Sequence, residues 1–232
     1  ERSLSESPMK PNKMRMGVFV MMRRADELLV GVVGAGAMGQ GIIQVAVSNG
    51  IKTIIHDSRP EVAFEARAQV SGRLERLVAK GKLDQAQADD ARAKMIVAQE
   101  LDDFAGCDVV IEAIIEDLEV KRTLFQKLES VVGEDCILCS NTSSIPIASI
   151  ASACKRPSHV AGLHFFNPVP LMKLVEVISA SDTDPQVAQY LHNLGQLLGR
   201  TPVMVKDAPG FLVNMGGGAY STEACAIFHE RV

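Results

Sequence analysis

The feature that most constrains the fold of this chain is a glycine-rich turn directly after a short apolar run. The segment LLVGVVGAGAMGQG, residues 28–41, has the pattern of a buried strand, followed by glycines in G-x-G-x-x-G spacing and then by a helical segment up to residue 49. In this spacing the first glycine makes a tight turn, the second lets the backbone approach a pyrophosphate, and the third lets helix and strand pack closely. We therefore predict that a dinucleotide binds at Gly34, Gly36, Ala37, Met38 and Gly39.

The rest of the chain alternates short apolar runs with longer amphipathic segments, which is typical of strand–helix–strand units on a parallel sheet. Seven further strands are predicted at residues 52–57, 95–99, 107–113, 136–141, 159–166, 174–179 and 202–207. The charged segments 61–80 and 84–94 predict a helical hairpin that projects from the sheet edge, as a solvated surface or as a substrate clamp. The expected fold class is α/β: a Rossmann-like, doubly wound, mostly parallel sheet with extra strands, and the start of an all-α second domain.

Domain boundaries are expected near both ends of the chain. Residues 1–27 lack clear periodicity and are expected to be a tail, either disordered or added for expression; their basic stretch also faintly resembles an organelle presequence. Residues 28–207 form the predicted Rossmann domain. Pro209 and Gly210 break the pattern, and residues 208–232 are interpreted as the truncated start of a helical domain, with a helix from Phe211 that the glycines at 216–218 weaken by about 1 kcal/mol each.

Composition limits the partners that this chain can have. Its 232 residues are 47% hydrophobic and 22% charged, with a formal net charge of −4, so no basic surface for nucleic acid is expected. No apolar run approaches the roughly 20 residues that span a bilayer. Five sparse cysteines favour a reducing compartment, expected to be a bacterial-type cytoplasm, with the mitochondrial matrix as a minor alternative. Cys136 and Cys139 are interpreted as core residues of a strand, and no metal is predicted.

An acidic residue ends the second predicted strand, at the position where such folds bind the adenosine ribose. Asp57 would accept hydrogen bonds from the ribose hydroxyls and repel a 2′-phosphate, which favours NAD over NADP as the cofactor. Two alternatives stay open: Asp57 could instead cap the following helix, and the nearby Arg59 could accommodate the phosphate of NADP.

Two ionisable residues interrupt the apolar strands of GLHFFNPVPLMKLVEV, residues 162–177. Oxidising an alcohol with a nicotinamide cofactor also requires a base, and a histidine with a pKa near about 6.5 suits that task. His164 would serve as the base, and Glu176 would orient its ring and stabilise the imidazolium. The alternative is a buried core histidine beside an exposed strand glutamate.

Four motifs together resemble the L-3-hydroxyacyl-CoA dehydrogenase family between Leu28 and Asn214. They are, in order, GAGAMGQG, SNTSSIPIASIA, GLHFFNPVPLMKLVEV and KDAPGFLVN. The resemblance implies NAD-dependent oxidation of L-3-hydroxyacyl-CoA to 3-oxoacyl-CoA, as in fatty-acid or phenylacetate-type β-oxidation, with His164 as base and Glu176 as its partner. Alternatives are a related dehydrogenase of free hydroxy acids or sugar acids, and a non-catalytic NAD-binding module.

The same resemblance implies roles for further residues. Ser143 and Asn214 would contact the reacting end of the substrate near the nicotinamide. The cofactor would meet Ala113, Glu116, Lys121, Asn141 and Ser143, and coenzyme A would meet Arg73 and Lys80 on the helical hairpin. The chain departs from the family pattern after Asn214, where Met215 stands in place of the usual Arg. The helical domain that forms the family's homodimer interface and one wall of its acyl pocket is expected to be missing, so we expect NAD binding with poor turnover.

Overall fold

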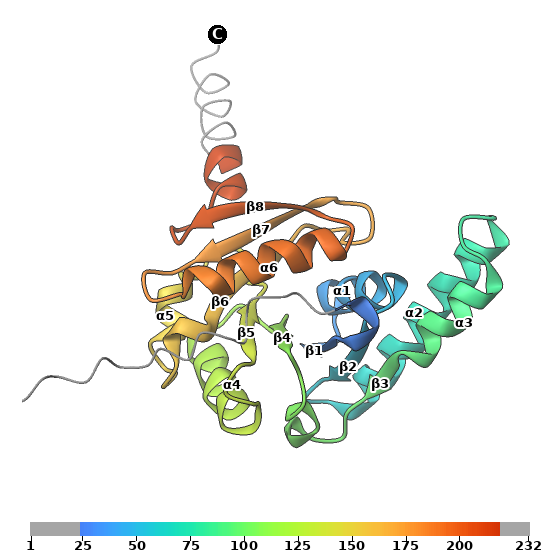
Figure 1. Cartoon of the computed structure of the whole chain (residues 1–232), viewed down its shortest axis with the longest axis horizontal. Helices are drawn as coiled ribbons and strands as arrows, with labels where there is room; N and C mark the ends of the chain where they lie inside the picture. The colour runs from blue at the N-terminus through green and yellow to red at the C-terminus, as the bar shows by residue number, and fades with distance from the viewer. Residues whose placement is uncertain (1–23, 219–232) are drawn as a thin grey trace, which may run out of the picture.

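Eight strands form one sheet in the computed structural model, which describes residues 24–218 (Figure 1). The strands are β1 (Leu29–Val33), β2 (Lys52–His56), β3 (Met95–Val97), β4 (Val109–Glu112), β5 (Ile137–Ser140), β6 (Val160–Phe165), β7 (Leu174–Ser179) and β8 (Thr201–Lys206). Their order across the sheet is β3-β2-β1-β4-β5-β6-β7-β8. Every neighbouring pair is parallel except β6 and β7. The predicted doubly wound, mostly parallel sheet with extra strands is confirmed.

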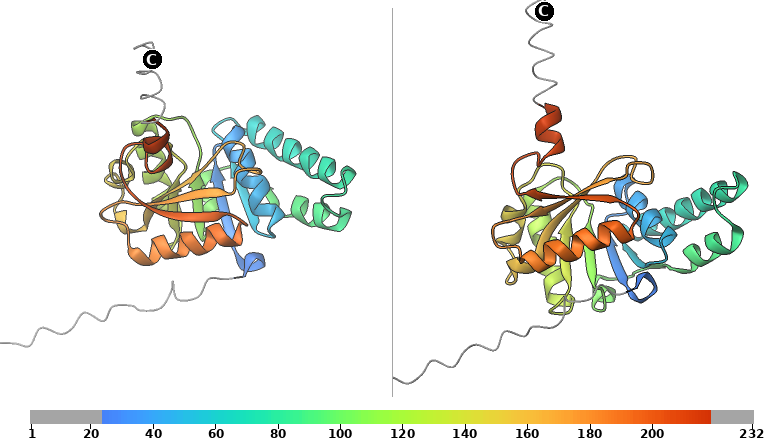
Figure 2. Two further views of the ribbon diagram at one scale, coloured as in Figure 1. Left: turned by 90° about the horizontal axis from the view of Figure 1, so that it is seen from above. Right: turned by 45° about the horizontal axis from the view of Figure 1, so that its top comes forward.

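Helices cover both faces of this sheet (Figures 1 and 2). One face carries α1 (Ala37–Ser48), α2 (Pro60–Ala79), α3 (Gln85–Ala93) and α6 (Pro185–Leu197), and the other carries α4 (Leu118–Val131) and α5 (Ile147–Ala151). Short 3-10 turns lie at Ala25–Glu27, Leu101–Phe104 and Pro157–His159. Successive strand residues point to opposite faces, so Val32 and Val33 belong to different core clusters. The central strands are mostly apolar because both of their faces are buried, whereas the edge strand β8 has no buried residue.

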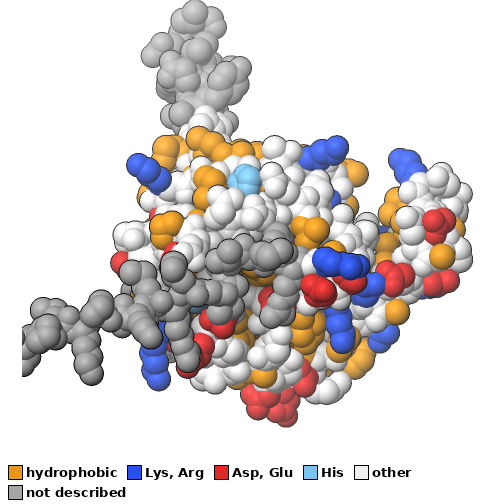
Figure 3. Space-filling view, viewed as in Figure 1, with side chains coloured by type: hydrophobic (Ala, Val, Ile, Leu, Met, Phe, Trp, Pro, Cys, Tyr) orange, Lys and Arg blue, Asp and Glu red, His pale blue; other side chains and the backbone are white. Residues whose placement is uncertain are grey.

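The predicted hairpin is formed by α2 and α3, which project from the β3 edge of the sheet (Figure 2). Gly81 has a φ of +65°, which allows the tight turn after α2, and the side chain of Asp84 caps α3 by accepting a hydrogen bond from the Gln87 amide. Arg92 and Glu75 form an ion pair between the two helices. Side chains of both charges lie on the face of the hairpin seen in Figure 3.

Two expectations about the chain ends need correction. Residues 25–27, expected to belong to a tail, form a 3-10 turn that leads into the buried Leu28. The helix expected from Phe211 begins at residue 213, because Gly210 and Phe211 have φ angles of 75° and 51° and so lie in the left-handed region. The helix then continues through the glycines to residue 218, the last described residue. The rest of the expected tail (1–23) and of the helical domain (219–232) lies outside the described residues.

Candidate active site

The glycine turn between β1 and α1 has the geometry that its sequence predicts. Gly34 has a φ of 98°, and its amide donates a 2.8 Å hydrogen bond to the carbonyl oxygen of His56 on β2. A Cβ on Gly39 would lie 1.8 Å from the Gly34 oxygen, so only glycine lets this helix approach the turn. A Cβ on Gly36, the N-cap of α1, would meet nothing within 4 Å. The start of a 12-residue helix therefore faces open space, which suits a phosphate group.

A cleft of about 970 Å³ opens beside this turn. Its walls include Gly34 and Gly36, Asp57 after β2, and the apolar side chains of Val120 and Leu124 on α4. A mixed pocket of this kind, with a charged group at one side and an apolar opposite wall, can hold a ribose and an adenine ring. The residues therefore fit the adenosine half of a dinucleotide.

Asp57 lies at the edge of this cleft with both carboxylate oxygens engaged. One oxygen accepts a 2.9 Å hydrogen bond from the Ala35 amide, and the other accepts a 3.1 Å bond from the Arg59 amide. Each oxygen keeps a further lone pair for a ribose hydroxyl. The N-cap of α2 is Arg59, so the alternative role of Asp57 as a helix cap is not what the fold shows.

A second cleft of about 360 Å³ shares Ala113 and Ile114 with the first. Its lining brings together eight of the residues expected at the nicotinamide and the substrate: Met38, Ala113, Glu116, Lys121, Asn141, Ser143, His164 and Asn214. These residues come from segments spread over most of the chain. The topology places them together because the carboxyl ends of neighbouring parallel strands lie at one edge of the sheet.

His164 and Glu176 face each other across the antiparallel pair of β6 and β7. They are directly opposite in register, and His164 Nδ1 lies 2.7 Å from Glu176 Oε2. His164 is 5% exposed and Glu176 is fully buried, so the alternative of an exposed strand glutamate is wrong. The other oxygen of Glu176 accepts hydrogen bonds from the amides of Leu212 (3.1 Å) and Val213 (2.9 Å). One buried carboxylate therefore holds both the histidine ring and the start of the last described helix.

Two amide side chains tie the neighbouring segments to this pair. Asn214 Nδ2 donates a 3.1 Å hydrogen bond to the backbone oxygen of Ser143, which joins two expected substrate contacts. Asn141 Oδ1 accepts a 2.8 Å bond from the amide of Phe165, next to His164. The loop after β5 is thus fixed to β6 and to the helix at residue 213.

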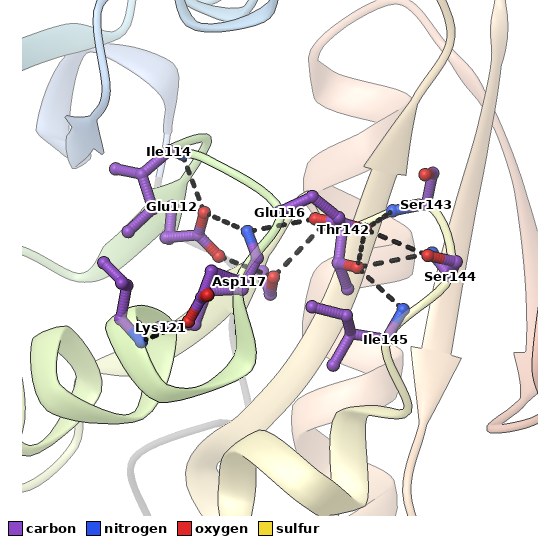
Figure 4. A network of polar contacts seen from close by, with 11 residues as sticks. Glu112, Ile114, Glu116, Asp117, Lys121, Thr142, Ser143, Ser144 and Ile145 are labelled. Carbon is purple, nitrogen blue, oxygen red and sulfur yellow. Dashed lines mark hydrogen bonds and ion pairs between the residues drawn. The ribbon is translucent and has the colours of Figure 1, made fainter.

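Glu116 and Lys121, which both line the smaller cleft, belong to a polar network (Figure 4). Lys121 Nζ lies 3.3 Å from Glu116 Oε2, while Glu116 Oε1 accepts hydrogen bonds from the Thr142 hydroxyl (2.5 Å) and the Ser143 amide (3.1 Å). Partial burial raises the pKa of Glu116. The Thr142 hydrogen bond, the charge of Lys121 and the Ser143 amide outweigh that effect, so the pKa lies below its ordinary value. Glu116 is therefore an anion at neutral pH.

Five expected site residues line neither cleft: Ala37, Gly39, Arg73, Lys80 and Glu176, which lies behind His164. Arg73 Nη2 donates a 2.7 Å hydrogen bond to Gln40 Oε1 on α1, and Gln40 Nε2 in turn donates to the Ala35 carbonyl at 3.1 Å. Arg73 is therefore linked to the glycine turn, whereas Lys80 is exposed at the end of α2.

Two residues that the sequence did not single out are central to the site, Glu112 and Thr142. Both are buried, at 0% and 1% exposure, and both bond to expected site residues. The available signal was an acid at the end of the apolar run VVIE and a threonine next to Ser143 in the SNTSS segment.

Cys136 and Cys139 are core residues, as predicted, whereas Cys154 is partly exposed. Cys136 and Cys139 are 3% and 0% exposed, and burial raises the pKa of both thiols. Residues 24–218 contain no cluster of three or more His, Cys, Asp or Glu that could hold a metal ion. No described helix combines the length and apolar character of a membrane span.

Comparison with known proteins places this geometry in a family context. Residues 29–208 match the family described as 3-hydroxyacyl-CoA dehydrogenase, NAD binding domain. The chain is 42% identical over 184 residues to a probable 3-hydroxybutyryl-CoA dehydrogenase of Deinococcus radiodurans, covering 79% of this chain and 66% of that protein. It is 40% identical over 203 residues to the 3-hydroxyadipyl-CoA dehydrogenase of Escherichia coli, covering 88% of this chain and 43% of that protein.

Solved structures agree with these sequence matches. The crystal structure of a 3-hydroxybutyryl-CoA dehydrogenase from Escherichia coli superposes with a TM-score of 0.86 at 40% identity, over 88% of this chain and 43% of that one. The corresponding enzyme from Ralstonia eutropha gives a TM-score of 0.84 at 37% identity, over 87% and 71% of the two chains. The chain spans less than two thirds of the length of the two curated relatives named above.

Proposed function

We propose that this chain, which belongs to the 3-hydroxyacyl-CoA dehydrogenase family, carries the cofactor site and the base of an NAD-dependent enzyme that oxidises L-3-hydroxyacyl-CoA to 3-oxoacyl-CoA. The observation that carries this proposal is His164, which lines the smaller cleft and lies 2.7 Å from the buried Glu176; this cleft shares Ala113 and Ile114 with the proposed adenosine cleft. The pair supplies a base where an alcohol would meet the nicotinamide.

When bound, NAD would supply the acceptor for the hydride from C3 of the substrate, and the protein would remove the hydroxyl proton. Glu176 bonds Nδ1 of His164, so Nε2 is the ring nitrogen available to take that proton. The Glu176 carboxylate then stabilises the imidazolium that forms, and it keeps the ring from turning. Ser143 and Asn214 line the same cleft and are proposed to hold the substrate oxygen.

Further features of the whole enzyme are proposed from the family resemblance. Arg73 and Lys80 are proposed to meet the nucleotide part of coenzyme A on the hairpin, and the pathway is proposed to be fatty-acid or phenylacetate-type β-oxidation in the cytoplasm. Residues 28–207 would form the NAD-binding domain, and residues 208–232 would begin a helical domain through which the full protein forms a homodimer. Size-exclusion chromatography with light scattering on the full-length protein tests the dimer.

The decisive assay follows acetoacetyl-CoA-dependent oxidation of NADH by absorbance, on this chain and on a version extended by a helical domain. His164→Ala is expected to lower turnover by about 10²- to 10⁴-fold, the usual contribution of a general base. His192→Ala on α6 is the matched control, because His192 lines neither cleft. Activity of His164→Ala within tenfold of the parent would refute the base assignment. NADH binding without any turnover in either version would favour free acids as substrates, or a non-catalytic role.

A further inference from the structure

A fully buried carboxylate, Glu112 at the end of β4, organises the wall between the two clefts (Figure 4). Its Oε1 accepts hydrogen bonds from Lys121 Nζ (2.6 Å) and from the Ile114 amide (2.7 Å). Its Oε2 accepts a 2.6 Å bond from the Ser140 hydroxyl. The donors come from α4, from the loop after β4 and from β5, so one side chain joins three separate segments.

The charge of Lys121 explains why this carboxylate is needed. Lys121 is 1% exposed, and a buried ammonium is strongly unfavourable unless an opposite charge and hydrogen bonds compensate the lost water. Glu112 supplies that charge at 2.6 Å, and Glu116 adds a second contact at 3.3 Å. An ammonium has three N–H donors, of which these two carboxylates can take two, and Lys121 lines the smaller cleft.

Glu112 also fixes the loop that carries Ser143. The Ser140 hydroxyl, which donates to Glu112, accepts a 3.1 Å bond from the Thr142 amide. The Thr142 hydroxyl then donates to Glu116, and Glu116 accepts from the Ser143 amide. Removing Glu112 would therefore disturb the first contact of this hydrogen-bonded series. It would also leave the charge of Lys121 without its nearest partner.

We propose that Glu112 is a positioning residue for NAD. It holds the Lys121 ammonium at the smaller cleft, and it fixes the loop after β4 and the loop after β5. This inference concerns the cofactor alone and goes beyond the proposed acyl-CoA chemistry. Its readout is therefore the affinity for NADH, which does not depend on turnover.

The test is a double-mutant cycle on the whole chain, with NADH affinity measured by titration of NADH fluorescence. Glu112→Gln and Lys121→Gln are each expected to weaken NADH binding at least tenfold. In the double variant the loss of affinity is expected to be clearly smaller than the two single losses combined, because Glu112 acts in part through that lysine. Glu112→Asp, which keeps the charge, is expected to recover part of the lost affinity.

Glu129→Gln is the matched control. Glu129 is also a largely buried carboxylate, and it accepts bonds from the Lys155 and Arg156 amides at the other end of α4. This variant is expected to lower the melting temperature and to leave NADH affinity within twofold. Should Glu112→Gln fail to fold, Ser140→Ala removes one bond to the carboxylate and is expected to weaken NADH binding about threefold. Unchanged NADH affinity in a folded Glu112→Gln or Ser140→Ala protein, or additive losses in the cycle, would overturn the proposal.

Discussion

Glu176 uses its two carboxylate oxygens for two different tasks, and a single substitution can test both. Glu176→Gln replaces one oxygen by an NH₂ donor, which must face either His164 or the amides of Leu212 and Val213. In an active preparation we expect turnover to fall by about 10² to 10⁴-fold, since the histidine loses its anionic partner. We also expect the free energy of unfolding to fall by about 0.5–2 kcal/mol, the range for loss of a helix cap.

Steady-state kinetics and urea denaturation measure these two effects separately. Lower turnover with unchanged stability would show that the glutamine keeps its oxygen on the amides of Leu212 and Val213 and turns its NH₂ group toward His164. Unchanged turnover would show that Glu176 does not act on the base at all.

His56 makes the stability of the chain depend on pH. Burial lowers the pKa of His56 below 6.5, although the nearby Asp57 and Asp103 act in the opposite direction, and burial also lowers the pKa of His159. The imidazoles of these two histidines therefore bind protons less readily in the folded state than in the unfolded state. This stability is present above about pH 6.5 and is lost as the pH falls through the lower pKa of the folded state.

We therefore expect a smaller free energy of unfolding at pH 5.5 than at pH 7.5, measured by urea denaturation. In His56→Gln, which cannot titrate in this range, the difference between the two pH values should shrink. The carboxylate pKa values that are shifted, those of Glu116 and Asp89, are lowered and so do not titrate here. An unchanged pH dependence in His56→Gln would mean that His56 makes no contribution.

At the scale of elements, the two basic residues of the α2–α3 hairpin should behave differently. Lys80 is exposed at the end of α2, so Lys80→Ala should raise the KM for acetoacetyl-CoA about two- to fivefold and leave NADH affinity unchanged. Arg73 is bonded to Gln40, which is bonded to the glycine turn, so Arg73→Ala should also weaken NADH binding.

Arg76→Ala supplies the control for these two variants, because Arg76 is an exposed cation on the same helix. Initial rates of an active preparation give the KM for acetoacetyl-CoA, and NADH titration gives the NADH affinity. If Arg73→Ala changes only the KM for acetoacetyl-CoA, the hydrogen bond to Gln40 does not contribute to NADH binding. If neither variant affects acetoacetyl-CoA, coenzyme A does not bind at the hairpin.

All eight strands were predictable because buried strands give apolar runs bounded by glycine, proline or charged residues. The His164–Glu176 pair was also predictable, since one ionisable residue in each of two neighbouring apolar strands has few ways to be satisfied. Glu112 was not, because an acid at a strand end is usually solvated, and its role depends on Lys121 turning inward from α4. The start of the helix at residue 213 was missed because nothing local marks Phe211 as left-handed.

At the scale of the whole molecule, one sheet separates two apolar layers, and the cysteines report on both. Cys139 belongs to the layer under α1 and α6, whereas Cys107 and Cys136 belong to the layer under α4 and α5. Burial raises the pKa of Cys107 to about 12 and raises the pKa values of Cys136 and Cys139 as well. Since the thiolate is the reactive form, all three should resist alkylation in the folded protein.

Most strands contribute residues to both apolar layers, and each remaining strand lies beside one that does. Neither layer can therefore open without breaking the sheet on which the other layer packs. We therefore expect Cys107, Cys136 and Cys139 to become reactive together as urea increases. Pulse labelling with iodoacetamide, followed by peptide mass spectrometry, gives the midpoint for each cysteine. Coincident midpoints would establish one cooperative unit that holds the glycine turn and the His164–Glu176 pair together. An earlier midpoint for Cys107 and Cys136 would instead show that the layer under α4 and α5, with Lys121, unfolds on its own.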